Sequence, residues 1–322
     1  MSDPNAGLAA VAPTTVDGGE LLPPAPDPAA TGKRARSLSQ DALADLIRRP
    51  MFWFAAALIL LFVVMAIFPS LFTSQDPNSC DLSLSRKPPG TNDAVFGYDL
   101  QGCDVYSRAI YGARASIVVG VVTTLLTMFI GIVVGTASGY FGRWIDAVLS
   151  RITDIFFAIP LLLGAILILT AFPKTSQATA GVEIMKVVLA LTVLGWTSMT
   201  RIMRASVIQV RNADFVVAAR ALGAGNWRII RRHVLPNSLT ALIVVATISL
   251  GGFIGAEATL SFLGIGLQPP VISWGQMINE AAKYIRVAPH MLFFPSLFLS
   301  LTVLAFIMLG DVVRDAFDPK LR

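Results

Sequence analysis

The sequence predicts an all-α integral membrane protein with six transmembrane helices and both chain ends in the cytoplasm. Three observations support this fold class. Hydrophobic residues make up 55% of the 322 residues and charged residues only 14%, which is typical of membrane proteins and not of soluble domains. The apolar residues gather in six runs of roughly 20 residues, the length that crosses a bilayer. Lysine and arginine are unevenly shared between the connecting segments.

The first 45 residues differ from the rest of the chain. They contain six prolines among many alanines and small polar residues, without hydrophobic periodicity. Such a segment buries too little apolar surface to offset its ordering entropy, so we expect residues 1–45 to form a disordered cytoplasmic tail. The segment does not resemble a signal peptide, because the first apolar run starts about fifty residues in and no small-residue cleavage site follows it.

Six candidate spans follow the tail, at about 51–72, 115–139, 153–172, 187–205, 238–266 and 288–310. The fourth span is the weakest. Its cleanly apolar part runs only from Val187 to Met199, and it reaches spanning length by including Arg201 and Arg204.

Individual residues predict irregularities in two other spans. Pro160 is expected to kink the third span, at whose start Arg151 and Asp154 are interpreted as a helix-end pair. In the fifth span we expect a kink or a break, because it is interrupted by Gly251, Gly252, Gly255 and Glu257.

The orientation follows from the positive charges. With the N-terminus in the cytoplasm, the inner segments hold 17 of the 25 lysines and arginines, and the outer segments hold 8. This ratio favours a topology with both termini inside. Anionic lipid headgroups can balance the net charge of +5, so we expect membrane lipid as a partner and no nucleic acid.

The longest cytoplasmic loop, about 206–237, is basic and helical in pattern. A short helix is predicted over 213–225, capped by Asn212 or Asp214 and ended by Gly223 and Gly225. Its apolar face combines positions i, i+3, i+4 and i+7, which are Phe215, Ala218, Ala219 and Leu222. This face could lie in the groove of a partner, or the loop could be a plain juxtamembrane anchor.

A second helix is predicted just before the fifth span. Trp227, Ile230 and Val234 share one side of it. The other side is basic and suits the headgroup boundary, with Arg228, Arg231 and Arg232.

The whole loop resembles the one that defines the binding-protein-dependent ABC importer permeases. The family pattern is Glu-Ala-Ala, three residues, Gly, nine residues, Ile-x-Leu-Pro. Ala218-Ala219 precede Gly223 at this spacing, and His233-Val234-Leu235-Pro236 ends the pattern, with Val217 in the usual place of Glu and His233 in the usual place of Ile. The resemblance implies a coupling helix that docks into a cytoplasmic ATPase subunit, through Asp214, Phe215, Ala218, Ala219, Leu222, Gly223 and Ala224.

Four further segments extend the resemblance over about residues 50–322, closest to the C-type permease of dipeptide and oligopeptide importers. They are FGYDLQGCDVYSRAIYGARAS (96–116), SGYFGRWIDAVLSRITDIFFAIP (138–160), LSFLGIGLQPPVISWGQMI (260–278) and GDVVRDAFDPKLR (310–322). The resemblance implies a type I ABC importer permease fold. Residues 46–112 would form the first transmembrane helix and an extracytoplasmic loop, and residues 113–322 a permease core with five transmembrane helices.

The implied function is that of a membrane permease subunit of an ATP-driven importer of dipeptides or oligopeptides in the inner or plasma membrane. The implied partners are a homologous permease in a heterodimer, two ATP-binding subunits or one fused pair, and an extracytoplasmic peptide-binding protein. The same subfamily also carries nickel chelates and other small solutes. A secondary transporter, the other main alternative, would show inverted repeats and several interior ionisable groups; a structural or channel subunit is the third hypothesis.

The chain shows no catalytic motif of its own. It contains no Gly-x-x-x-x-Gly-Lys-Ser/Thr phosphate loop; the segment GTASGYFGR lacks the lysine, and its glycines fit helix packing and a turn. The only histidines, His233 and His290, fall on opposite sides of the membrane in the predicted topology. We therefore expect a non-catalytic subunit without metal or cofactor, with ATP and Mg bound by the partner ATPase subunits.

Cys80 and Cys103 are the only cysteines, and both fall in the first outer loop. The outside of the membrane is oxidising, so we expect a disulfide between them; two unrelated buried thiols are the alternative. Cys103 also occupies a place where the subfamily pattern usually has Arg.

Glu257 is the one acidic residue deep in a predicted span. Intramembrane carboxylates are costly and usually face an interior path or a partner group. Glu257 could attract the ammonium end of a peptide, or it could be a structural acceptor bonded to a neighbouring helix or subunit. We favour the structural role.

Overall fold

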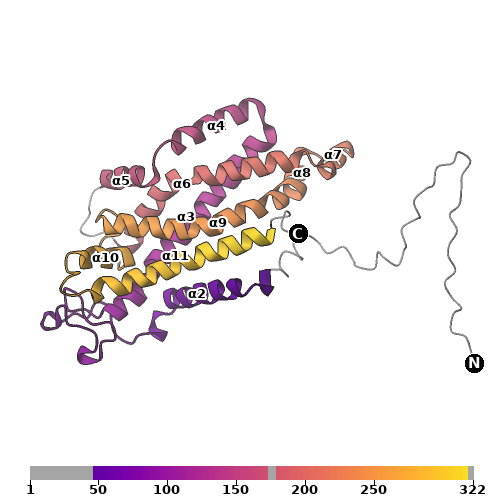
Figure 1. Cartoon of the computed structure of the whole chain (residues 1–322). Helices are drawn as coiled ribbons and strands as arrows, with labels where there is room; N and C mark the ends of the chain where they lie inside the picture. The colour runs from indigo at the N-terminus through magenta and orange to yellow at the C-terminus, as the bar shows by residue number, and fades with distance from the viewer. Residues whose placement is uncertain (1–45, 173–178, 318–322) are drawn as a thin grey trace, which may run out of the picture.

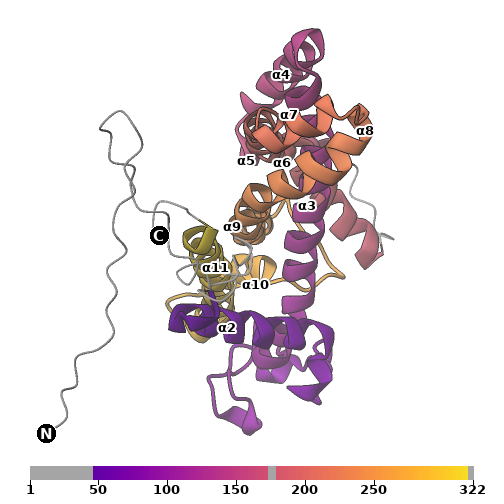
Figure 2. The same cartoon turned by 90° about the vertical axis from the view of Figure 1, so that its right-hand side faces the viewer.

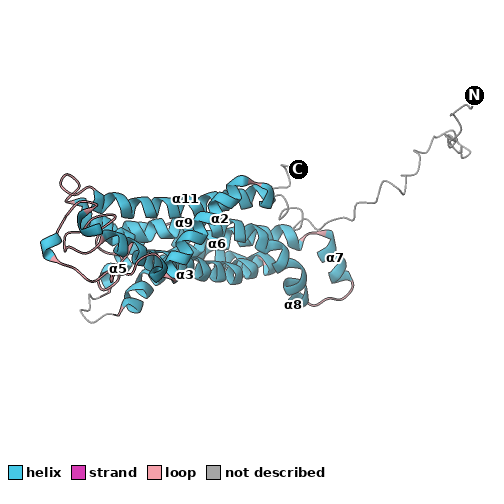
Figure 3. Ribbon diagram, turned by 90° about the horizontal axis from the view of Figure 1, so that it is seen from below, coloured by secondary structure: helices cyan, strands magenta, loops and turns pink. Residues whose placement is uncertain are grey.

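The structure, a computed structural model, describes residues 46–172 and 179–317, so the predicted N-terminal tail lies outside the described residues. Five long helices run along the bundle in Figures 1 and 3, and no strand occurs in the described part. They are α2 (Pro50–Ile67), α3 (Val105–Phe141), α6 (Ala180–Arg211), α9 (Leu235–Phe262) and α11 (His290–Phe317). α3 crosses the others obliquely, from the edge formed by α2 to the edge formed by α4 (Figures 1 and 2).

These five helices are long and apolar enough to cross a membrane, and a broken pair makes six crossings if its two helices form one span. The pair consists of α4 (Arg143–Phe157) and α5 (Leu161–Ala171), whose axes are bent by 81°. Pro160 immediately precedes α5, where its ring disfavours continuation of the preceding helix. The predicted all-α membrane fold is therefore confirmed, with five or six candidate spans; the predicted third span corresponds to the pair α4 and α5, starts ten residues earlier than predicted and is divided near Pro160.

The two ends of the bundle carry different structures. The α7 end carries α7 (Asp214–Ala221), α8 (Asn226–Ile229) and the π-helical turn η5 (Ile230–Val234), together with the start of α2 and the end of α11 (Figures 1 and 3). An ion pair of 3.1 Å between Arg49 and Asp315 joins the start of α2 to the end of α11. The opposite α10 end carries α10 (Trp274–Ala282) and the 68–104 loop, whose single turns are η2 (Pro69–Leu71), η3 (Leu82–Leu84) and η4 (Thr91–Asp93).

The closest helix packing joins α3 to α6. Three glycines on one face of α3 touch α6 so tightly that an added Cβ would lie 2.6–2.9 Å from its nearest atom; they are Gly131, Gly135 and Gly139. Gly142 has a φ of +64° in the turn from α3 to α4, a conformation that favours glycine. The glycines of GTASGYFGR therefore serve helix packing and a turn, as predicted.

α6 is much longer than the weak fourth span that the sequence predicts. Charged residues along it form ion pairs: Lys186 with Glu183 at 2.8 Å, and Arg204 with Asp146 of α4 at 2.6 Å. The predicted pair of Arg151 and Asp154 is wrong, because α4 lies against α6 and Asp154 binds Arg201 at 2.8 Å. These partners let an arginine-bearing segment continue the helix.

α9 is continuous from Leu235 to Phe262, so the break expected at its glycines is absent. Gly251 lies against α11, where an added Cβ would be 3.1 Å from the Val303 carbonyl oxygen. Gly252 and Gly255 have open space beside them. Glycine lowers helix propensity by only about 1 kcal/mol, and packing against α3, α6 and α11 offsets this.

Candidate coupling surface and outer face

α7 is anchored to the bundle on one side only. Val216 is fully buried and belongs to a cluster with Val207 of α6, Ile229 of α8 and Val234 of η5. A helix of eight residues is too short to be stable alone, so this contact fixes its position. The periodicity of the loop did not identify Val216 as the anchor.

The predicted apolar face of α7 is uncovered. Leu222 is 89% exposed, Phe215 is about half exposed, Ala218 is exposed, and Ala219 is half-buried. Val217, in the place of the family glutamate, is exposed as well. The structure therefore leaves Phe215, Ala218 and Leu222 exposed on α7, which lies at the end of the bundle (Figure 1), whereas Ala224 packs against the buried cluster.

The start and end of α7 differ from the prediction. Neither Asn212 nor Asp214 caps the helix with a side-chain bond; Ala213 is the N-cap residue, and Asp214 lies in the first turn, where a negative charge complements the helix dipole. The helix ends at Ala221, four residues earlier than expected.

The C-terminal end of α7 is a Schellman motif. The Gly223 N–H donates to the Arg220 carbonyl at 3.0 Å, and the Ala224 N–H donates to the Ala219 carbonyl at 3.1 Å. Gly223 has a φ of +81°, which only glycine adopts without strain. The predicted stop at Gly223 is therefore present, and Gly223 and Ala224 contribute backbone geometry to the surface.

The second helix of the loop buries a different set of residues from the one predicted. Ile230 and Val234 are buried with Ile229, whereas Trp227 is 72% exposed. The π-helical turn η5 explains the difference, because its wider turn rotates the residues before it relative to those after it. The basic side is exposed as predicted, with Arg228, Arg231 and Arg232.

At the α10 end, a disulfide joins Cys80 to Cys103. Beneath it lies Arg108, a buried cation that binds Asp99 and lies 3.5 Å from Glu280 of α10. Burial raises the pKa of the Glu280 carboxyl, and the charge of Arg108 partly opposes this shift. The sequence analysis did not identify this cluster, since its three members are separated by up to about 180 residues.

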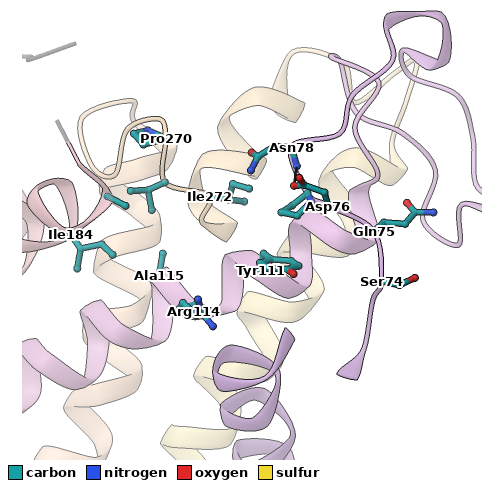
Figure 4. Close-up of a pocket in the computed structure, with 13 residues that line it drawn as sticks. Ser74, Gln75, Asp76, Asn78, Tyr111, Arg114, Ala115, Ile184, Pro270 and Ile272 are labelled. Atoms are coloured by element: carbon teal, nitrogen blue, oxygen red, sulfur yellow. Dashed lines mark hydrogen bonds between the residues drawn. The ribbon is translucent and has the colours of Figure 1, made fainter. Parts of the chain in front are cut away.

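A pocket of about 570 Å³ opens beside this braced loop (Figure 4). Its walls come from the 74–78 segment, α3, the start of α6 and the 270–272 segment, and include Tyr111 and Arg114. Arg114 also donates to the Ala66 and Ile67 carbonyl oxygens, at 2.9 and 3.2 Å, and so satisfies the C-terminal end of α2. The α10 end is therefore a hollowed surface whose loop is held by a disulfide.

Glu257 lies inside this one chain. It is fully buried, and it accepts a hydrogen bond of 2.8 Å from the Ser261 hydroxyl, which in turn accepts from the Leu267 N–H at 3.0 Å. The hydroxyls of Ser116 on α3 and Ser273 also lie beside the carboxyl. The carboxyl thus meets α3 and the segment that links α9 to α10.

The described residues contain no group of three or more His, Cys, Asp or Glu that could hold a metal ion. His233 lies in η5 at the α7 end. His290, at the α10 end, contacts the Tyr98 carbonyl oxygen at 3.1 Å through Nε2.

Five or six apolar helical crossings, an exposed helix at one end and a disulfide-bonded loop at the other describe a multi-pass membrane protein. Residues 128–322 match the family described as "Binding-protein-dependent transport system inner membrane component", and residues 37–89 match the "N-terminal TM domain of oligopeptide transport permease C". The chain belongs to this family of inner membrane components and is a multi-pass inner membrane protein.

Relatives of this family cover nearly all of the chain. It is 36% identical to the oligopeptide transport system permease protein OppC of Bacillus subtilis, over 90% of this chain and 92% of that protein. It is 38% identical to the dipeptide transport system permease protein DppC of the same organism, over 89% of this chain and 87% of that protein. The glutathione transport system permease protein GsiD of Pectobacterium atrosepticum is 36% identical, over 83% of this chain and 86% of that protein.

A solved structure supports the same fold. The inward-facing MetNI methionine ABC transporter contains a chain that superimposes with a TM-score of 0.52 and 21% identity, over 65% of this chain and 96% of that one. The ABC transporter permease fold that the sequence predicts is therefore confirmed.

Proposed function

We propose that this chain is a transmembrane permease subunit of an ATP-driven importer of dipeptides or oligopeptides and forms half of the translocation pathway. The observation that carries the proposal is the bare apolar face of α7, which lies within the loop that defines the family and is held to the bundle by Val216. The names of the oligopeptide and dipeptide relatives support the substrate class.

The proposed assembly contains a homologous permease, two ATP-binding subunits or one fused pair, and an extracytoplasmic peptide-binding protein. The α7 end faces the cytoplasm in this proposal, because its loop carries the largest group of arginines. The disulfide-braced α10 end suits docking of the binding protein. ATP and Mg bind to the ATPase subunits, and this chain is not catalytic.

The proposed mechanism is alternating access driven through α7. ATP binding closes the ATPase dimer, whose groove pulls α7, reorients the spans and opens the path toward the docked binding protein. Hydrolysis reverses the change. ATP drives these steps only through its differential affinity for the two states.

The alternatives differ in substrate or in energy source. A relative named for glutathione supports small peptide-like solutes, while nickel chelates or other small solutes remain the alternative within the same subfamily. The ligand retained by the purified binding protein distinguishes these substrates. A secondary transporter would move solute without any ATPase subunit, so transport assays with and without the ATPase separate it from the importer.

The test of the coupling surface is a charge on its apolar face. Leu222→Asp or Ala219→Asp would bury an unpaired carboxylate at the ATPase interface, at a cost of several kcal/mol. We expect loss of peptide uptake and of ATPase co-purification, with normal membrane insertion. Arg231→Gln and Arg232→Gln are the matched controls and should have much smaller effects, since each headgroup contact contributes about 1 kcal/mol. Normal transport and ATPase retention by Leu222→Asp would exclude α7 as the docking element.

A further inference from the structure

Both ends of the coupling segment, residues 212–225, are attached to the same place on another helix. The first attachment precedes α7. Arg211, the last residue of α6, donates from one guanidinium nitrogen to the Gly139 carbonyl oxygen at 2.7 Å and to the Tyr140 carbonyl oxygen at 3.2 Å. These carbonyl oxygens belong to the last turn of α3, where they lack N–H donors within the helix and lie at the negative end of the helix dipole.

The second attachment follows α7. The Tyr140 hydroxyl donates to the side-chain oxygen of Asn226 at 3.0 Å. Asn226 is the first residue of α8, directly after the coupling segment. Tyr140 is buried, and its ring packs in the cluster that also holds the anchor Val216. The coupling segment is therefore a loop with both ends fixed to the Gly139–Tyr140 turn.

This turn cannot slide along α6. A Cβ added at Gly139 would lie 2.9 Å from both the Arg204 carbonyl oxygen and the Val207 Cβ, so the two backbones are already in contact. Arg204 in turn holds α4 through Asp146. A displacement of the Gly139–Tyr140 turn is thus transmitted to α3, α6 and α4 together, because close-packed helices move as a unit.

We propose that Tyr140 and Arg211 are positioning residues that clamp the coupling segment to the end of α3, so that a pull on α7 moves α3 and α6 as one body. The inference rests on the proposed function and adds the path of the force. Without the clamp, α7 would remain attached through Val216 and the chain, and the loop would absorb part of the displacement.

The first experiment measures peptide moved per ATP hydrolysed. The full complex with its binding protein is reconstituted in liposomes with radiolabelled alanine dipeptide and tripeptide. Tyr140→Phe should retain its ATPase subunits and continue to hydrolyse ATP, while peptide moved per ATP falls about three- to tenfold, the change expected from one buried hydrogen bond. Tyr106→Phe is the matched control, since it loses one hydroxyl bond, to the Phe72 carbonyl at 3.1 Å, at the other end of the bundle.

Changes at Asn226 separate the clamp from local folding. Asn226→Asp keeps an acceptor for Tyr140 and should retain coupling, whereas Asn226→Leu should resemble Tyr140→Phe. The double variant Tyr140→Phe with Asn226→Leu should move as much peptide per ATP as either single variant, because both changes remove the same hydrogen bond. Additive losses, or unchanged peptide per ATP in Tyr140→Phe, would overturn the clamp.

A distance measurement tests the clamp without any substrate. Spin labels at Val133→Cys on α3 and Arg228→Cys on α8 should keep one separation with and without trapped ATP, because the clamp joins the two elements. Tyr140→Phe should make that separation depend on nucleotide. A nucleotide-independent separation in Tyr140→Phe would overturn the clamp, whereas failure of the proposed function would appear separately, as normal transport by Leu222→Asp.

Discussion

Two buried acidic residues in this chain are stabilised in different ways. Asp99 at the α10 end binds the guanidinium of Arg108, so its charge is matched. Among the described residues, Glu257 forms no ion pair and is surrounded by serine hydroxyls and the start of the α9–α10 segment. The carboxyl accepts one hydrogen bond, from Ser261 on its own helix, and lies beside hydroxyls of α3 and of the α9–α10 segment, a position that supports the structural role for Glu257.

Glu257→Gln should therefore retain most transport, because the amide oxygen still accepts from Ser261 and the amide nitrogen can donate to a neighbouring hydroxyl. Glu257→Leu should lower the stability of the purified complex by about 1–3 kcal/mol, since it leaves the buried Ser261 hydroxyl without its acceptor. Thermal unfolding and uptake of free-amine and N-acetylated peptides are the measurements. A loss confined to free-amine peptides in Glu257→Gln would support a pathway role instead.

The pair of cysteines supports a second prediction about individual residues. Non-reducing mass spectrometry of protein from the native membrane should detect a peptide that links Cys80 to Cys103. Their separation of 23 residues corresponds to a stabilisation of about 3 kcal/mol through restriction of the unfolded chain, so Cys103→Ser should unfold at lower temperature. A reduced sample is the control. Free thiols at both positions in the non-reduced protein would contradict the disulfide.

At the scale of elements, the contact of α3 with α6 depends on glycines that a single methyl group would disturb. A Cβ at Gly135 would lie 2.7 Å from the Met203 Cβ and 2.8 Å from the Thr200 carbonyl oxygen. Neither atom is the end of a flexible side chain, so relief requires the helices to separate. The clamp at Gly139 lies one turn further along the same face, and separation here would weaken it as well.

Gly135→Ala should therefore destabilise the protein by about 1–3 kcal/mol through overpacking, less a partial gain in helix propensity. Gly181→Ala is the matched control, because the same change near the start of α6 meets no heavy atom within 4 Å. Thermal unfolding of the two variants in one detergent compares them directly. Equal stability of both would show that α3 and α6 do not require this close approach.

The elements show what a sequence can and cannot predict here. Apolar runs located the spans because span length and composition are local properties, and periodicity located the exposed face of α7 for the same reason. The extent of α6 was missed because the charged residues beyond the predicted span have partners: Lys186 pairs with Glu183, and Arg211 donates to the Gly139 carbonyl oxygen of α3, 72 residues away. The pocket and the Arg108 cluster were also missed, since each is assembled from segments that meet only in the folded chain.

For the whole molecule, the differences between the α7 end and the α10 end indicate which end faces the cytoplasm. The Arg49–Asp315 pair brings the start of α2 and the end of α11 to the α7 end, as an even number of crossings requires. The arginine-rich loop lies at this same end, and the disulfide lies at the other. The positive charges and the cysteines thus favour the same orientation through independent physical causes, the retention of basic loops in the cytoplasm and the oxidising exterior.

This orientation predicts the labelling of two single-cysteine variants. Val287 at the α10 end is 71% exposed and Leu222 at the α7 end is 89% exposed, so either side chain can be replaced by cysteine without opening the core. A membrane-impermeant maleimide that passes the outer envelope should label Val287→Cys in intact cells and leave Leu222→Cys unlabelled. In inverted membrane vesicles stripped of the ATPase, Leu222→Cys should react and Val287→Cys should not. The bridged native cysteines give no background, which the unmodified chain checks. The reverse pattern would place α7 outside, where no ATPase subunit could reach it.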